Sequence, residues 1–476
     1  MLNELAHLLL RWQPLFRQRI TWVRLISVLL GLIVAYGRRT VTSSITIRGR
    51  QSEPWAADYL VFSRASWEVE GLFDGVVDAS IDTLDRFCTR GRYLLVAIDD
   101  TSLPKTGKKI AAARWMRDPM SPPFQVNLRW GLRYVHLAMI LPLNELGFDP
   151  RVVSIDFALA PSIKKPGAKA TDEEVANYKE IKKKKNMSIV AVERFTHLRK
   201  HLDATGQHSR TVLMIGDGSY TNRNVLKNLP ERTEYIGRTR GDLAIYAAAP
   251  AGGRKVYGER LPTPNELRKD EKVPWIHTEL FYAGEKRKVR YKELKQVLWQ
   301  TGGQRKLLRI FVIAPTPYRA YCNGRGRTYY REPAYLLTTD RDSPADELIQ
   351  PYLARWQIEV EHRDQKTGLG VGHAQVSNDK SVERLHAAHV AMWSMVKLAA
   401  LRTFGLTRTA AYPERPAWYP QEPGQRASQT DIVCALRAEL QRQPPAKKRT
   451  IIRSNLQKRM KPLRKKQKMV AMAGAG

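Results

Sequence analysis

Short apolar runs bounded by turn-forming residues recur through the middle of the chain and predict buried β-strands. Apolar positions at helical spacing precede these runs. They include the 12-residue run Leu25–Tyr36, which is too short to span a bilayer and predicts a buried helix. Strands interleaved with helices predict an α/β fold. The expected strands cover Tyr93–Ile98, 130–140, 151–159, 212–215 and 334–339.

The pattern divides the chain into three parts. Residues 1–90 are predicted to be mostly helical, either as a DNA-end-binding bundle or as a helical cap on the core. Residues 91–405 are expected to form the core, in which alternating polar and apolar stretches predict a β-rich insertion at about 245–332. Residues 406–476 indicate a linker, a short helix and a basic tail that we expect to be disordered when free.

The net charge and the cysteines narrow the classes of partner and of metal site that the chain could have. The chain carries a formal net charge of +34, and residues 442–468 hold 12 Lys or Arg and no acid. Such an excess favours a polyanionic partner, with nucleic acid as the first candidate and a membrane surface as the second. The three cysteines are scattered, and the pair His197 and His201 lacks accompanying cysteines, so we expect no structural zinc and a cytoplasmic protein.

One predicted helix carries a stripe of four functional side chains. We expect it to begin with Ser343 as N-cap and Pro344 at the first helical position. At about 100° per residue, all four lie within roughly 60° on one face, whereas Glu361 lies at roughly 180°. Taken alone, the pattern also fits a solvated, salt-bridged face. The stripe consists of Tyr352, Arg355, Glu359 and Lys366.

The order and spacing of this stripe resemble the Y-R-E-K signature of bacterial insertion-sequence transposases of the DDE type. The resemblance implies an RNase H-like mixed-sheet core in which Glu359 is the third catalytic carboxylate. It also implies that Tyr352, Arg355 and Lys366 contact DNA near the cleaved end. Such a core needs two aspartates upstream, on strand ends.

Two places supply these aspartates. Asp99 and Asp100 follow the strand expected to end at Ile98, and the sequence leaves open which of the two is the metal ligand. Asp217 follows the strand 212–215 between glycines, and the resemblance makes it the second acid. At each place, a turn with a side-chain-to-backbone hydrogen bond is the structural alternative. A basic loop with Lys105, Lys108 and Lys109 follows the first pair and is expected to contact phosphates.

The resemblance and the residues together predict a cut-and-paste DNA transposase. Asp99 or Asp100, Asp217 and Glu359 would hold two Mg²⁺ ions, for which Mn²⁺ could substitute. The expected partner is double-stranded DNA, as inverted-repeat ends and target, bound by a homodimer close to the bacterial nucleoid and away from membranes. The alternatives are an RNase H-like nuclease without strand transfer and a non-catalytic basic DNA-binding protein.

Overall fold

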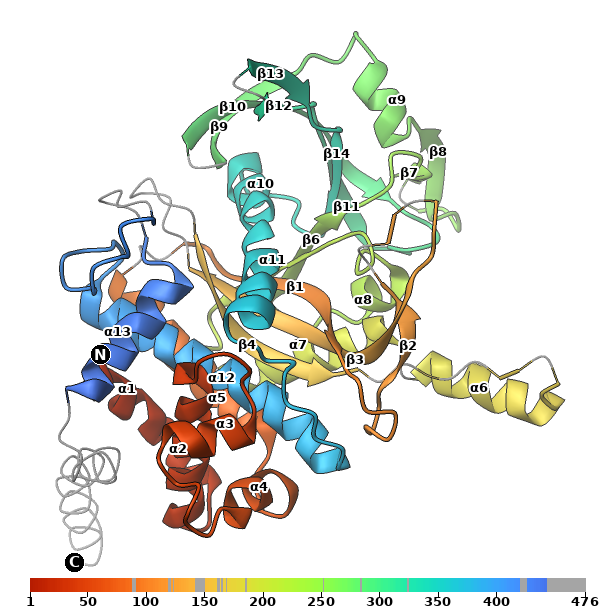
Figure 1. Cartoon of the computed structure of the whole chain (residues 1–476). Coiled ribbons are helices and arrows are strands. Elements are labelled where there is room, and N and C mark those ends of the chain that lie inside the picture. Colours follow the sequence, from red (N-terminus) through yellow and green to blue (C-terminus); the bar gives the residue numbers. More distant parts are fainter. Residues whose placement is uncertain are drawn as a thin grey trace, which may run out of the picture.

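The computed structural model shows an α/β protein in which helices cover a large mixed sheet (Figure 1). It describes residues 1–442 with gaps. The residues that it does not describe are 88–90, 119–120, 123, 142–149, 161–162, 164–165, 168, 185, 251, 283–284, 323–324, 420–425 and 443–476. The predicted basic tail and part of the predicted linker therefore lie outside the described residues.

Residues 1–87 are mostly helical, as predicted. These helices pack around the long buried helix α12 (Asp379–Phe404), so that one hydrophobic core includes residues from Met1 to Leu436. The apolar run from Leu25 is buried as far as Ile33, and α2 ends at Val34. In the described part of the chain, no helix is long and apolar enough to cross a membrane. The elements are α1 (Leu2–Leu9), η1 (Leu10–Leu15), α2 (Arg19–Val34), α3 (Val41–Ile47), α4 (Ala56–Ser63) and α5 (Val69–Phe87).

The centre of the sheet has the RNase H-like arrangement. β1 pairs antiparallel with β3 and parallel with β5, β5 pairs parallel with β6, and β4 pairs antiparallel with β3. β1 and β5 carry continuous apolar runs because helices cover both faces of the sheet at this point. The strands are β1 (Tyr93–Pro104), β2 (Arg114–Arg117), β3 (Leu128–Leu141), β4 (Arg151–Leu159), β5 (Thr211–Gly216) and β6 (Thr233–Arg238).

The β-rich insertion is present and extends the central sheet. β14 (Ala334–Thr338) pairs antiparallel with β6, and β11, β10 and β7 continue outward from it. β12 and β13 form a separate two-stranded hairpin. The other insertion elements are β7 (Ile245–Ala248), β8 (Tyr257–Leu261), α9 (Pro264–Lys269), β9 (Ile276–Tyr282), β10 (Glu285–Leu298), β11 (Leu307–Ile313), β12 (Pro317–Cys322) and β13 (Arg325–Tyr330).

The remaining helices cover the two faces of the sheet. On one face, α10 and α11 share a buried cluster with Ala97 of β1 and Ile215 of β5. On the other face, α7 is tied to β4 by the ion pair between Arg194 and Asp156. These helices are α6 (Asp172–Lys184), α7 (Met187–Ala204), α8 (Arg223–Lys227), α10 (Ala345–Ala354), α11 (Trp356–Arg363), the π-helix η3 (Asp364–Gly368) and α13 (Gln429–Gln441).

Two sequence-based expectations about local structure were wrong. β1 does not end at Ile98, because its antiparallel pairing with β3 continues to Pro104. Ser343 is not the N-cap of α10: Pro344 takes that place. The Ser343 hydroxyl instead donates to Asp340 Oδ2 at 2.6 Å, which closes the turn before the helix.

Candidate active site

The register of two parallel strands brings the first two acids together. β1 and β5 are paired as far as Ala97 and Ile215, and two residues beyond this pair come Asp99 and Asp217. Because side chains alternate along a strand, both acids lie on the face that carries α10 and α11. β5 ends at Gly216 while β1 continues, so Asp99 lies where its parallel neighbour stops.

Asp100 points to the opposite face. Its Oδ2 accepts a hydrogen bond from Arg133 Nε at 2.8 Å, on the neighbouring strand β3. The structure thus separates the two adjacent aspartates: Asp99 lies with Asp217, and Asp100 is held in an ion pair with Arg133. Local sequence could not identify Arg133 as this partner, because it lies 33 positions further along the chain.

Glu359, on helix α11, is linked to Asp99 by one arginine that contacts both carboxylates. Arg355 Nη2 lies 3.0 Å from Glu359 Oε1, and Arg355 Nη1 lies 3.6 Å from Asp99 Oδ2. The predicted helix is interrupted at Arg355, between α10 and α11, but this residue keeps helical torsions, with φ −52° and ψ −33°. Arg355 and Glu359 therefore stay one turn apart on the same side, as the helical wheel predicts.

The electrostatics of Asp99 reflect this crowding. Burial, with smaller contributions from the nearby Asp217 and Asp100, raises the pKa of the Asp99 carboxyl to about 7, although Arg355 acts in the opposite direction. Asp217 is held differently: its Oδ1 accepts hydrogen bonds from the Ser219 amide at 2.9 Å and the Ser219 hydroxyl at 2.6 Å. The turn expected as the structural alternative is thus present, and it fixes the carboxylate beside Asp99.

A family model described as DDE superfamily endonuclease matches residues 16–306, which is more than half of the chain. The chain belongs to the DDE superfamily endonucleases. The matched range contains Asp99 and Asp217 and ends before Glu359, so the Y-R-E-K stripe lies beyond it. No curated protein matches the chain. Membership implies an enzyme that cleaves DNA, and members of the superfamily generally use divalent metal ions.

The acids of this DDE endonuclease suit such an ion chemically, but they do not form a ready-made cluster. Carboxylate oxygens are the ligands that Mg²⁺ prefers. Within the described residues, no group of three acids, histidines or cysteines is close enough to hold a metal. The Arg355 guanidinium lies between Asp99 and Glu359, so this side chain must move before the two carboxylates can share a cation.

Two more residues of the stripe lie beside the acids. Tyr352 lies near Arg355 and Asp217, and burial raises the pKa of its hydroxyl. Burial, together with the nearby Arg129, lowers the pKa of Lys366, while Asp99 and Asp100 oppose this shift. Lys366 is presented by the π-helix η3, a local widening that the helical wheel did not anticipate and that often occurs at functional sites.

Of the three basic-loop residues, Lys105 does not fit the prediction of a phosphate contact. Its side chain is buried, and its ammonium donates to the carbonyl oxygens of Gly372 and Ala374 at 2.9 and 2.8 Å. It also contacts His386 Nε2 at 2.7 Å. Strand β1 continues past Asp100, and this extension carries Lys105 into the interior. Lys108 and Lys109 are exposed, as the prediction requires.

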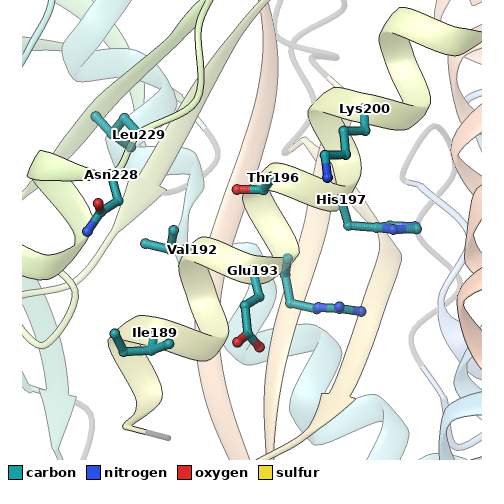
Figure 2. A pocket seen from close by; sticks show the side chains of 9 residues that line it. Ile189, Val192, Glu193, Thr196, His197, Lys200, Asn228 and Leu229 are labelled. Carbon is teal, nitrogen blue, oxygen red and sulfur yellow. The ribbon is translucent and has the colours of Figure 1, made fainter. Parts of the chain in front are cut away.

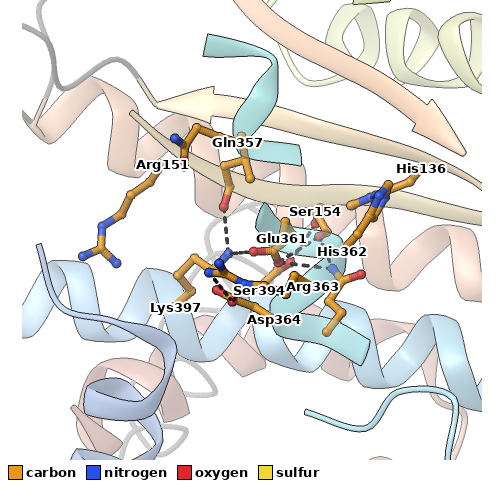
Figure 3. A network of polar contacts seen from close by, with 12 residues as sticks. His136, Arg151, Ser154, Gln357, Glu361, His362, Arg363, Asp364, Ser394 and Lys397 are labelled. Carbon is orange, nitrogen blue, oxygen red and sulfur yellow. Dashed lines mark hydrogen bonds and ion pairs between the residues drawn. The ribbon is translucent and has the colours of Figure 1, made fainter. Parts of the chain in front are cut away.

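Glu361, two residues after Glu359, is buried in a polar network behind the site (Figure 3). Its Oε2 lies 2.5 Å from Lys397 Nζ of α12, and its Oε1 accepts from Ser154 Oγ at 3.3 Å and from Gln365 Nε2 at 3.2 Å. Nearby, His136 Nδ1 and His362 Nε2 lie 2.9 Å apart. These contacts fix α11 and η3 against β4 and α12.

The groove shown in Figure 2 is separate from these acids. It has a volume of about 710 Å³ and is lined by α7 and by Asn228 and Leu229 after α8. Its Arg194 is ion-paired with Asp156, whose neighbour Phe157 is paired with His136. His136 contacts α11, so Asp156 points to the other face of the sheet. The groove therefore lies on the face opposite Glu359.

Proposed function

We propose that this DDE endonuclease is a cut-and-paste DNA transposase in which Asp99, Asp217 and Glu359 form the catalytic centre. The observation that carries the proposal is the convergence of the three acids. Two adjacent strands place Asp99 beside Asp217, and Arg355 joins Asp99 to Glu359. Asp99 is the first acid in this proposal because Asp100 is engaged by Arg133 on the other face.

The three carboxylates would hold two Mg²⁺ ions, which supply activation of the attacking oxygen and stabilisation of the leaving oxygen. The residues of the chain itself hold the three carboxylates in position. Strands β1 and β5 fix the two aspartates, and the network around Glu361 fixes the helix that brings Glu359. With cations held by these acids, the Arg355 guanidinium would be available for a DNA phosphate, which suits its planar set of donors.

The DNA-binding part of the proposal rests on charge and position. Tyr352 and Lys366 lie beside the same acids and would contact the backbone at the cleaved end, with Lys108 and Lys109 farther out. The net charge of +34 suits a long contact with DNA. Transposition joins two ends, so we propose a homodimer on DNA that holds inverted-repeat ends and target.

The test is an in vitro reaction on a plasmid that carries the DNA flanking the coding region. With Mg²⁺ or Mn²⁺, the wild type is expected to nick the plasmid at the ends of the element and to join these ends to a target plasmid. Glu359→Gln is expected to bind DNA without nicking. Nicking without joined products would indicate a nuclease that lacks strand transfer. Nicking by Glu359→Gln at the rate of the wild type would contradict the proposed catalytic centre.

A further inference from the structure

An exposed aromatic and basic surface lies on β2, the first part of β3 and the described residues between them, which we call the aromatic hairpin (residues 114–118, 121–122 and 124–130). It stands at the edge of the central sheet beside β3 (Figure 1). Trp115 is 63% exposed and Leu128 is 61% exposed. Phe124 and Val126 of the connecting loop are also exposed. A group of large apolar side chains in contact with water marks an interaction site more often than a solvated surface.

Trp115 is held in a fixed orientation. It is paired with Trp130 across the hairpin, and the two rings meet edge to face, with centroids 5.7 Å apart and an angle of 62°. The indole nitrogen of Trp130 donates to the Gly107 carbonyl at 3.1 Å, which anchors the inner ring. The outer ring is therefore rigid although it is exposed, and little side-chain entropy is lost when a flat ligand packs on it.

The charge around this ring favours a polyanion. Between residues 101 and 141 the sequence has a single acid, Asp118, and this acid is ion-paired with Arg129 at 2.6 Å. Arg114 and Arg117 flank Trp115 on the same strand and are exposed. Cations beside a flat aromatic ring are the combination that binds single-stranded nucleic acid, in which bases stack on the ring and phosphates meet the cations.

The aromatic hairpin borders the candidate active site. Lys366 lies within electrostatic range of Arg129 and Asp118 of the hairpin and also of Asp99 and Asp100. On β3, Trp130 lies an even number of residues before His136, which is paired with Asp99, so Trp130 and its partner Trp115 lie on the face of the sheet that carries Asp99. A DNA strand whose phosphate lies between Asp99 and Glu359 therefore passes close to the hairpin.

We propose that Trp115 is a stacking platform for an unpaired base of the DNA next to the cleaved phosphate. The inference rests on the proposed function, since it takes DNA as the substrate. In a continuous duplex the bases are stacked on one another, so the platform acts on a strand that is frayed or flipped out at the cleavage point. Arg117, which lies on the same face of β2 as Trp115, binds a phosphate beside that base.

The test compares two DNA probes in the absence of divalent ions: a blunt duplex and a forked duplex of the same paired length with unpaired thymidine arms. Anisotropy titrations with the full chain are expected to show that Trp115→Ala weakens binding of the fork about tenfold. The same variant is expected to change binding of the blunt duplex less than about twofold, because no base is available for stacking. Trp115→Phe should keep most of the affinity for the fork.

Trp418→Ala is the matched control, since Trp418 is 87% exposed on the segment between α12 and α13 and should affect neither probe. Equal losses on fork and duplex, or no loss on the fork, would overturn the stacking proposal. Thermal unfolding of each variant confirms that the fold is retained. The outcome is independent of the proposed chemistry: nicking by Glu359→Gln would refute the catalytic centre, whereas an unchanged fork affinity in Trp115→Ala refutes the platform alone.

Discussion

Glu359 and Glu361 stand two residues apart on the same helix and meet opposite surroundings. The side chain of Glu359 is 33% exposed and is ion-paired with Arg355, which also contacts Asp99. Glu361 is 4% exposed and is held by Lys397, Ser154 and Gln365. A carboxylate whose bonding capacity is filled by buried partners serves the fold, whereas one that is shared and open to solvent can bind a cation.

The largest expected difference between the two acids is catalytic. Glu359→Gln should lower the rate of Mg²⁺-dependent nicking about a thousandfold or more, the scale of losing one member of a catalytic unit. Its free energy of unfolding should change by less than about 1 kcal/mol, because a half-exposed ion pair contributes little. Glu347→Gln, at an exposed position of α10, is the control and should nick like the wild type. Nicking rates and urea unfolding measure both quantities.

The second expected effect is on stability. Lys397→Met leaves the Glu361 carboxylate buried without its counter-ion, which should lower the free energy of unfolding by about 3–5 kcal/mol. The double variant Glu361→Gln, Lys397→Met removes both charges and should recover a large part of that loss. Denaturant unfolding of the two variants and the wild type measures these free energies. A single variant as stable as the wild type would show that the network does not hold α11.

The third expected effect concerns Lys105, a buried cation whose protonation should make the stability of the protein depend on pH. Burial lowers its pKa to about 7, while the unfolded chain keeps the ordinary value of 10.5. As the pH falls from 10.5 to about 7, the unfolded chain gains a proton that the folded chain does not. The free energy of unfolding should therefore fall by up to about 1.4 kcal/mol per pH unit from this group. Urea unfolding across this window should show the slope in the wild type and its loss in Lys105→Met.

The smallest expected effect is on the salt dependence of DNA binding, which should differ between the exposed lysines and the buried Lys105. Lys108→Ala and Lys109→Ala should each reduce the salt dependence of DNA binding by about one unit of slope, since each removes one phosphate contact. Lys105→Met should leave that slope unchanged, because the Lys105 ammonium is occupied by Gly372 and Ala374. Anisotropy titrations at several salt concentrations measure the slopes. If all variants and the wild type had equal slopes, the loop that carries Lys108 and Lys109 would not contact DNA.

The sequence predicted what depends on local pattern. The strands around Asp99 and Asp217, the helical first 90 residues and the separation of Glu359 from Glu361 all follow from periodicity. The choice between Asp99 and Asp100 required the register with β5 and the position of Arg133 on β3. The burial of Lys105 required knowledge of how far β1 continues against β3. These features depend on residues distant in sequence, which local pattern does not encode.

The most direct test of the catalytic centre is to replace Mg²⁺ by Fe²⁺ and map where the bound iron cleaves the polypeptide in the presence of ascorbate and peroxide. The account predicts cuts near residues 99, 217 and 359 that excess Mg²⁺ suppresses and that Glu359→Gln weakens. Cuts confined to other parts of the chain, or no cut that Mg²⁺ suppresses, would contradict the claim that these three carboxylates bind the metal.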